Sequence, residues 1–396
     1  MFKLIFSLAA VTTLAQVLQL ISQPLLTHLY TKESFGYLSI VVSIVSFGSI
    51  VCNFQFNNLA LIEKKNVDNI FLSGLFFSLI LELMFLLLLV LFSYHIFKEN
   101  LFYFILFTIL YLAFYCFNAL FRAVLLKKQK NKLYSWGILI RSFVVIISQV
   151  LFSFYYNNFG LIIGVVIGEF LLMILGLLLA KNIVKIRSLE IKKIAVPFLR
   201  NKKFLIIGTI QELFSTSMFI APLLLITYNF SYAIGGEFSV VHKLSWGPAF
   251  LLAQVVSPVL LQFISNKDFK DTFLYDYKKS VLFFMFFSTL IYFTSEYIFK
   301  FFLEHDWYEA IWMSKYILIW VVSFVMALPY RVLLRAEGKQ IIQLYVDIFI
   351  LLVFLSIFIF HFSFHNYIYL IFIFGVIGNF LIMFAANKSV RSRGWV

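Results

Sequence analysis

The sequence alternates between twelve long apolar stretches and short polar loops. A helix that crosses a bilayer needs about 20 mostly apolar residues, because lipid offers the backbone no hydrogen-bond partners. Every stretch is long enough for one crossing, so we expect an all-α polytopic membrane protein with 12 transmembrane helices. The spans are predicted near residues 4–26, 35–62, 70–94, 101–126, 133–155, 159–180, 204–228, 238–264, 280–302, 311–334, 340–360 and 367–387.

The basic residues give these spans an orientation. Most of the 32 lysines and arginines fall in alternate loops, which all lie on one side if the N-terminus is cytoplasmic. Cytoplasmic loops carry the excess of Lys and Arg, so both termini are predicted to be cytoplasmic. The net charge of +14 therefore reflects topology, and no nucleic-acid partner is expected. The first stretch lacks a small-residue cleavage site and is interpreted as a span, not a removable signal.

The longest basic connection divides the spans into two sets of six. We expect an N-terminal six-helix lobe at 1–185, a basic cytoplasmic linker at 186–203 and a C-terminal six-helix lobe at 204–396. An even number of spans in each set makes an internal repeat parallel. Its pseudo-twofold axis then runs along the membrane normal.

Two short matches support such a repeat. A Pro-Leu-Leu run at Pro24 recurs at Pro222, each time before the first outer turn of its half, and the second turn is predicted to be two residues longer. Near the inner end of the fourth span of each half, Arg122 corresponds to Arg331. The matches keep their order along the chain, which favours duplication over chance.

Charged side chains at span depth are few. Each costs about 2.5 to 3.5 kcal/mol on insertion scales and is expected to face a bundle interior or a wet cavity. Two interpretations stay open: structural ion pairs, of which Arg141 with Glu169 is an example, or the lining of a cleft. The residues concerned are Glu82, Arg122, Arg141, Glu169, Glu212, Lys243 and Asp347.

Uncharged polar residues form stripes on two predicted helices. Helical spacing places four side chains of the first span on one face and four of the eighth span within ~60° of one another. Hydrogen bonds between helices or a water-filled cleft between the halves both explain these stripes. The first comprises Thr12, Gln16, Gln19 and Gln23, and the second Lys243, Gly247, Gln254 and Pro258. Helices are expected to be interrupted or kinked at Pro222, Pro248, Pro258 and Pro329.

Motifs for other chemistry are missing from the sequence. It contains no HExxH, no GxSxG, no glycine-rich phosphate loop and no cysteine pair at metal spacing. Cys52 and Cys116 lie inside apolar spans, and the six histidines are scattered. We therefore expect no cofactor, no metal and no enzymatic activity.

Two segments carry a resemblance to a known family. Residues 23–38, QPLLTHLYTKESFGYL, look like the first outer turn of the Wzx-like polysaccharide-repeat flippases, which belong to the MATE-like MOP superfamily. Residues 335–339, RAEGK, are similar to the loop that this family carries after its tenth span. The likeness extends over the whole chain in length, span number and six-plus-six plan. His28 stands where family members often have Arg.

The resemblance implies a function. Such a protein moves an undecaprenyl-pyrophosphate-linked oligosaccharide across the bacterial inner membrane by alternating access, for O-antigen (lipopolysaccharide) or capsule synthesis. Its expected partners are this substrate, membrane lipid, and the polymerase and chain-length proteins of the same pathway. The candidate residues are Arg122, Arg141, Lys243 and Arg331 for the pyrophosphate, Gln16, Gln19, Gln23 and Gln254 for the sugar, and Glu82, Glu169, Glu212 and Asp347 for proton coupling.

Other functions stay open. Another MOP-superfamily exporter is the main alternative, carrying either a drug or cation or a peptidoglycan precursor. A drug exporter should have a cleft rich in acids without matching cations, and peptidoglycan flippases usually carry two extra spans. A membrane glycan polymerase or glycosyltransferase typically has a long outer loop, whereas the outer segments here are predicted to be short.

Overall fold

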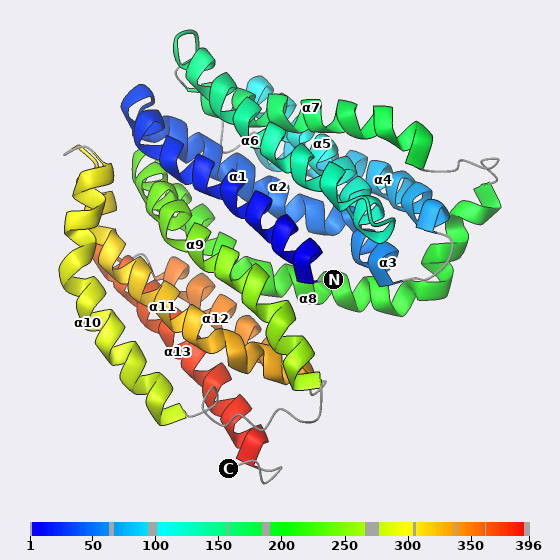
Figure 1. The fold of residues 1–396 in the computed structure, drawn as a ribbon. Coiled ribbons are helices and arrows are strands. Elements are labelled where there is room, and N and C mark those ends of the chain that lie inside the picture. The colour runs from blue at the N-terminus through cyan, green and yellow to red at the C-terminus, as the bar shows by residue number, and fades with distance from the viewer. Residues whose placement is uncertain are drawn as a thin grey trace. The chain divides into compact units, whose positions relative to one another are not determined.

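A computed structural model describes residues 2–62, 67–93, 101–156, 158–183, 191–265, 277–303, 306–336, 339–360 and 362–391. Within these ranges the chain forms thirteen α-helices and no strand (Figure 1). The helices are α1 (Phe2–Leu29), α2 (Lys32–Asn53), α3 (Phe56–Ile62), α4 (Val67–Ser93), α5 (Leu101–Lys127), α6 (Asn131–Ser153), α7 (Gly160–Ile183), α8 (Ile191–Asn229), α9 (Tyr232–Ser265), α10 (Tyr277–Phe302), α11 (Tyr308–Ala336), α12 (Gln340–Ile359) and α13 (Phe364–Arg391).

Eleven of the twelve predicted spans each coincide with one long helix, and the second, 35–62, covers α2 and the short α3. In the described part of the chain, ten helices are long and apolar enough to cross a membrane, and α1 and α9 coincide with the two remaining predicted spans. The protein is therefore an all-α polytopic membrane protein, as predicted.

The helices form two compact units, Met1–Thr216 and Ser217–Val396. The division falls inside α8, whose backbone leaves helical geometry only at Asn201 (φ −114°, ψ 17°). Of the predicted linker at 186–203, residues 191–203 are helical and the earlier ones lie outside the described residues. The lobe boundaries stay predictions.

The second predicted span, 35–62, is not one continuous helix. Phe54 and Gln55 both adopt left-handed backbone conformations, with φ of 44° and 61°. The Phe54 N–H bonds the Ile50 oxygen at 3.2 Å and ends α2. The break coincides with a run of amide side chains that begins at Asn53, and such side chains compete with helical backbone hydrogen bonds.

The prolines do not end their helices. α8 continues through Pro222, α9 through Pro248 and Pro258, and α11 through Pro329. Interruption at these prolines is therefore wrong, and the kinks given as the alternative stay a prediction. Neighbouring helices and side chains in a membrane bundle tolerate the backbone groups that proline leaves without partners.

The turns that follow the first span of each unit, predicted to be outer turns, are built alike. α1 ends at Leu29 and α2 begins at Lys32, whereas α8 ends at Asn229 and α9 begins at Tyr232. The turns are thus equal in length, and the predicted difference of two residues is wrong. The Thr31 hydroxyl accepts from the Ser34 N–H at 3.4 Å, and Ser231 likewise accepts from Ile234 at 3.2 Å.

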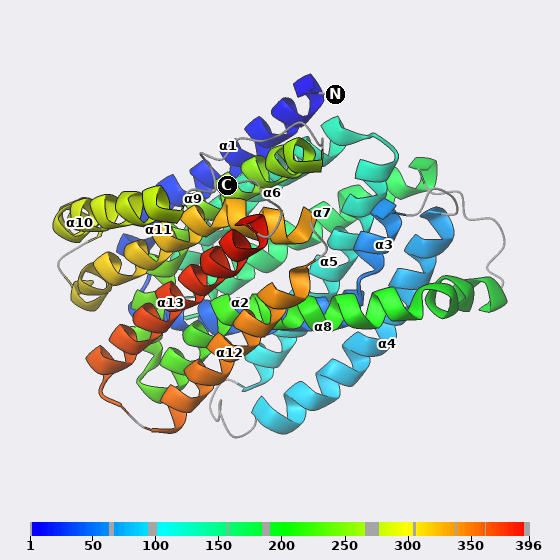
Figure 2. The same ribbon diagram turned by 90° about the horizontal axis from the view of Figure 1, so that it is seen from below.

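The turns that follow the fourth span of each unit repeat as well. The Lys130 N–H bonds the Leu125 oxygen at 2.8 Å, and the Lys339 N–H bonds the Leu334 oxygen at 2.8 Å. Each bond closes the end of a corresponding helix, α5 or α11. α5 packs against α2, α4 and α7, and α11 packs in the same way against α9, α10 and α13 (Figure 2). The two units therefore share one plan.

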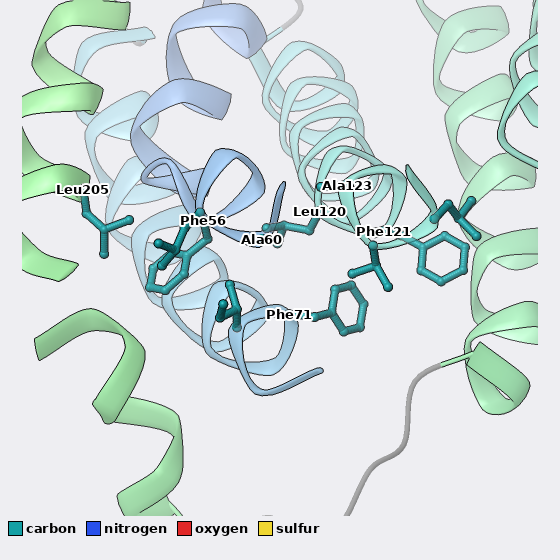
Figure 3. Packing of buried hydrophobic residues seen from close by; sticks show 11 residues of the cluster. Phe56, Ala60, Phe71, Leu120, Phe121, Ala123 and Leu205 are labelled. Carbon is teal, nitrogen blue, oxygen red and sulfur yellow. The ribbon is translucent and has the colours of Figure 1, made fainter. Parts of the chain in front are cut away.

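A large aromatic and aliphatic cluster holds the inner part of the first unit together. Phe56 of α3 packs with Phe71 of α4, Leu120 and Phe121 of α5, and Leu205 of α8 (Figure 3). All five side chains are almost fully buried. This cluster fixes α5, which positions the polar residues described next.

Candidate functional site

A stripe of polar side chains runs along α5. Tyr111, Tyr115, Asn118 and Arg122 follow one another at spacings of four, three and four residues. Residues at these spacings share one face of a helix. Tyr111 and Asn118 are buried, whereas Arg122, nearer the end of the helix, is exposed.

The stripe meets a buried ion pair. The Arg141 Nε donates to the Glu169 Oε1 at 2.6 Å, so the predicted pair between α6 and α7 is confirmed. The Asn118 amide donates to the Glu169 Oε2 at 2.6 Å and to its backbone oxygen at 3.0 Å. Tyr111 also hydrogen-bonds Arg141. Each Glu169 carboxylate oxygen thus has a donor, as buried charge requires.

Three glycines bring α6 and α7 close enough for this pair. Gly160, Gly164 and Gly168 recur every four residues on α7. A Cβ at Gly164 would lie 2.9 Å from the Gln149 backbone nitrogen, and one at Gly168 would overlap the Val145 side chain. Small residues at this spacing are a recurring way for membrane helices to pack backbone against backbone.

The second unit contains a similar cluster on the corresponding helices. The Arg331 Nη1 of α11 lies 3.7 Å from the Asp347 Oδ1 of α12. The Arg331 Nη2 donates to the Asn379 Oδ1 of α13 at 3.0 Å, and the Asn379 amide donates to the Ser323 hydroxyl at 2.8 Å. The guanidinium also lies 5.4 Å from the ring centre of Phe324.

The glutamines of α1 have mixed environments. Gln19 donates to the Ser142 hydroxyl of α6 at 3.2 Å, next to Arg141. Gln23 is 1% exposed, and neither its nitrogen nor its oxygen has a hydrogen-bond partner among the residues that the structure describes. The buried Gln16 Oε1 also has none. The Thr12 side chain lies outside the described residues. Gln16 and Gln23 therefore retain unused hydrogen-bonding capacity.

The other two predicted acids hydrogen-bond neutral groups. Glu82 accepts from the Ser78 hydroxyl of its own helix at 2.9 Å. Glu212 of α8 accepts from the Gln55 amide at the break between α2 and α3, and Gln55 also donates to the Gly208 oxygen at 3.3 Å. In the described part of the chain neither acid forms an ion pair.

The structure brings together only some of the predicted residues. Arg141 meets Glu169, and Arg331 meets Asp347. Lys243 lies exposed on α9, and the Gln254 side chain lies outside the described residues. Our prediction from the sequence missed Asn118 and Asn379, which complete the two clusters. The spacing of polar residues on α5 contains the signal for Asn118.

Metal-binding geometry is absent where the structure can be described. In those ranges no group of three or more His, Cys, Asp or Glu side chains is arranged to hold a metal ion. Cys52 and Cys116 are buried free thiols.

No protein-family model matches the chain. No curated protein matches it either. Solved structures do match. The lipid II flippase MurJ, in an inward closed conformation, has a TM-score of 0.75 and 16% identity, over 96% of this chain and 87% of MurJ.

Two transporters described as MOP-superfamily members match almost the full length. An inward-facing multidrug-resistance MATE transporter has a TM-score of 0.60 and 14% identity, over 98% of this chain and 94% of its own. A transporter from Pyrococcus furiosus has a TM-score of 0.59 and 15% identity, over 99% of this chain and 95% of its own. The chain therefore has the fold of these transporters.

Proposed function

We propose that the protein is a flippase for a lipid-linked oligosaccharide whose head group is a diphosphate. The observation that carries this proposal is the structural likeness to a lipid II flippase over 96% of the chain, with a TM-score of 0.75. The resemblance of residues 23–38 to polysaccharide-repeat flippases points the same way. The cargo is then an undecaprenyl-pyrophosphate-linked repeat unit for O-antigen or capsule.

The polar residues of the first unit suit such a cargo. A diphosphate needs cations where the dielectric constant is low, and guanidinium groups bind phosphate through paired hydrogen bonds. Arg122 belongs to the polar stripe of α5, and Arg141 of α6 contacts Glu169, which Asn118 of that stripe binds. Arg122 is nearer the predicted cytoplasmic end. Gln16 and Gln23 offer amides to sugar hydroxyls. We assign Lys243 and Gln254 of α9 the corresponding roles in the second unit.

The cellular setting follows from this proposal. The protein is placed in the bacterial cytoplasmic membrane with both termini inside, next to the polymerase and chain-length proteins that use its product. Lipid surrounds the exposed apolar faces, such as that of α10. Proton coupling is assigned to the set Glu82, Glu169, Glu212 and Asp347.

A second candidate is a drug or cation exporter. It is supported by the match to a MATE transporter and by Glu82 and Glu212, which have no ion-pair partner in the described ranges. The two ion pairs that contain Arg141 and Arg331 favour the flippase instead, because an exporter of cations has little use for buried arginines.

The test is deletion of the gene in its native host, followed by measurement of lipid-linked repeat units in each leaflet. The flippase predicts repeat units that accumulate on the inner leaflet, restored to the outer leaflet by the wild-type gene. Unchanged outward display after deletion would contradict it. Loss of resistance to a cationic drug, with normal surface glycan, would favour the exporter.

A further inference from the structure

The guanidinium group of Arg141 is only partly used. Its ion pair with Glu169 is made through Nε alone, at 2.6 Å. A planar guanidinium carries five N–H donors, and the pair of terminal nitrogens matches the spacing of two phosphate oxygens. Among the described residues, no hydrogen bond to those terminal nitrogens is found besides the contact with Tyr111.

Arg141 does not face the lipid. The exposed apolar side chains of α6 follow a stripe that includes Trp136, Phe143, Ile147 and Leu151. At about 100° per residue, Arg141 is rotated by ~120° from the centre of this stripe. Its side chain is nevertheless 22% exposed. The exposed end of the guanidinium is therefore accessible from a direction other than the lipid stripe.

Unlike the partly exposed Arg141, Glu169 is almost completely buried. Its side chain is only 3% exposed. Within the described ranges, the titratable groups that face it are Arg141 from α6, and Tyr111 and Tyr115 from α5, with Arg122 further along the same stripe of α5. α2 also packs against α7, but its charged residues, Lys32 and Glu33, both lie in its first turn. Arg141 is the cation in direct contact with Glu169.

We propose that Glu169 holds the Arg141 guanidinium while the site is empty, and that Arg141 exchanges the carboxylate for the diphosphate when cargo binds. The proposal rests on the proposed function. A carboxylate left without its cation in a buried site favours the neutral form, so Glu169 takes up one proton as Arg141 leaves it. Asn118 holds the carboxyl group in place throughout.

Arg331 is unsuited to the same exchange. Its side chain is 7% exposed, its Nη2 donates to Asn379, its Nη1 lies 3.7 Å from the Asp347 carboxylate, and its guanidinium lies over the Phe324 ring. The two clusters therefore differ in kind: the pair in the first unit can open toward a ligand, and the pair in the second unit is closed.

Binding of farnesyl diphosphate to the purified full-length protein in lipid nanodiscs tests this exchange, with the dissociation constant measured between pH 6 and pH 8. Because wild type takes up one proton on binding, its affinity should rise by about tenfold for each unit by which the pH falls, relative to the affinity of Glu169→Gln. Glu169→Gln should bind at least about tenfold tighter than wild type at pH 8. Arg141→Ala should bind at least about tenfold more weakly.

The ion pair between Lys128 and Asp68, 2.5 Å apart, supplies the matched control. Asp68→Asn removes one carboxylate from an ion pair in the same unit, and it should leave both affinity and pH dependence unchanged. Arg141→Lys keeps the charge without the guanidinium fork and should weaken binding. If Arg141→Ala fails to fold, the affinities of Arg141→Lys and Glu169→Gln test the exchange, provided that both variants have the melting temperature of wild type.

Equal pH dependence in wild type and Glu169→Gln would overturn the exchange, as would wild-type affinity in Arg141→Lys and Arg141→Ala. The fate of the proposed function is read separately from the gene deletion. If lipid-linked glycan accumulates on the inner leaflet but diphosphate binding does not depend on Arg141, the exchange is contradicted and the proposed function stands. Normal display in the deletion, together with pH-coupled binding, removes the oligosaccharide cargo alone.

Discussion

The Tyr30 hydroxyl donates a hydrogen bond to the Gln149 backbone oxygen at 2.5 Å. Tyr30 follows the last residue of α1, and Gln149 lies near the C-terminal end of α6. The Gln149 side chain in turn donates to the Leu161 oxygen of α7 at 3.0 Å. These two hydrogen bonds connect the ends of α1, α6 and α7, next to the glycines of α7 that pack against α6.

Tyr30→Phe should destabilise the protein by about 1 kcal/mol, because it leaves a buried carbonyl without its donor. Burial raises the pKa of Tyr30 above its ordinary value of about 10. The contribution of the hydroxyl is therefore fully present below about pH 10 and is lost as the pH rises through the folded-state value. Thermal denaturation of both proteins at several pH values checks this. A difference that varied between pH 6 and pH 9 would contradict the assignment.

Arg331→Ala should destabilise the second unit strongly, by about 3 to 5 kcal/mol, because Asp347 is left buried without its cation. The double variant Arg331→Ala/Asp347→Ala should recover a large part of that loss. Thermal unfolding in detergent measures both. Single and double variants of equal stability would show that the pair is not the origin of the loss.

The spans were predictable because lipid forces each crossing into an apolar helix of limited length. The break at Phe54 was not, although Asn53, Gln55 and Asn57 interrupt the apolar pattern there. A hydropathy window averages such a short polar run with its apolar neighbours. The outer turns were misaligned because Pro24 and Pro222 were treated as equivalent. The helix ends are set instead by the caps at Thr31 and Ser231.

The candidate site was predictable only in part. The costs of buried charge pointed to Arg141 and Glu169 as a pair, and the structure contains it. The role of Asn118 depends on how α5 is rotated against α7, and burial at the Phe56 cluster sets that rotation. Arg122 and Arg331 match in sequence, yet Arg122 is exposed whereas the Arg331 side chain is buried, with 7% exposure. Equivalent positions in a repeat therefore lie in different environments.

Glu169→Gln should make the flipping rate insensitive to an imposed pH gradient, because the proton that accompanies release of Arg141 is lost. Asp347→Asn should keep the response, since Arg331 is closed to ligand, but at lower protein stability. Flipping of a fluorescent lipid-linked saccharide in proteoliposomes measures the rates. Unchanged rates in Gln or Asn variants of all four acids, Glu82 and Glu212 included, would end the idea of proton coupling.

Gln23→Leu should stabilise the protein while it reduces flipping. The side chain is 1% exposed and has no hydrogen-bond partner in the described part of the chain, so its replacement removes a buried, unpaired polar group that costs about 1 to 3 kcal/mol. Loss of the amide also removes a proposed contact with sugar. Melting temperature and surface glycan are the two measurements. A more stable protein with wild-type glycan display would take Gln23 out of the sugar set.

Gly168→Ala should cost about 1 to 3 kcal/mol, because the added methyl group overlaps Val145 and pushes α6 from α7 beside the Arg141 and Glu169 pair. Gly137→Ala is the matched control on α6. Its methyl group would meet only the end of the Leu172 side chain, at 3.0 Å, which can move aside. Helix propensity favours Ala over Gly by up to about 1 kcal/mol, so Gly137→Ala should be neutral or stabilising. Unfolding in detergent compares the stabilities of the Gly168→Ala and Gly137→Ala variants. Equal stability would contradict a role for Gly168 in holding Arg141 and Glu169 together.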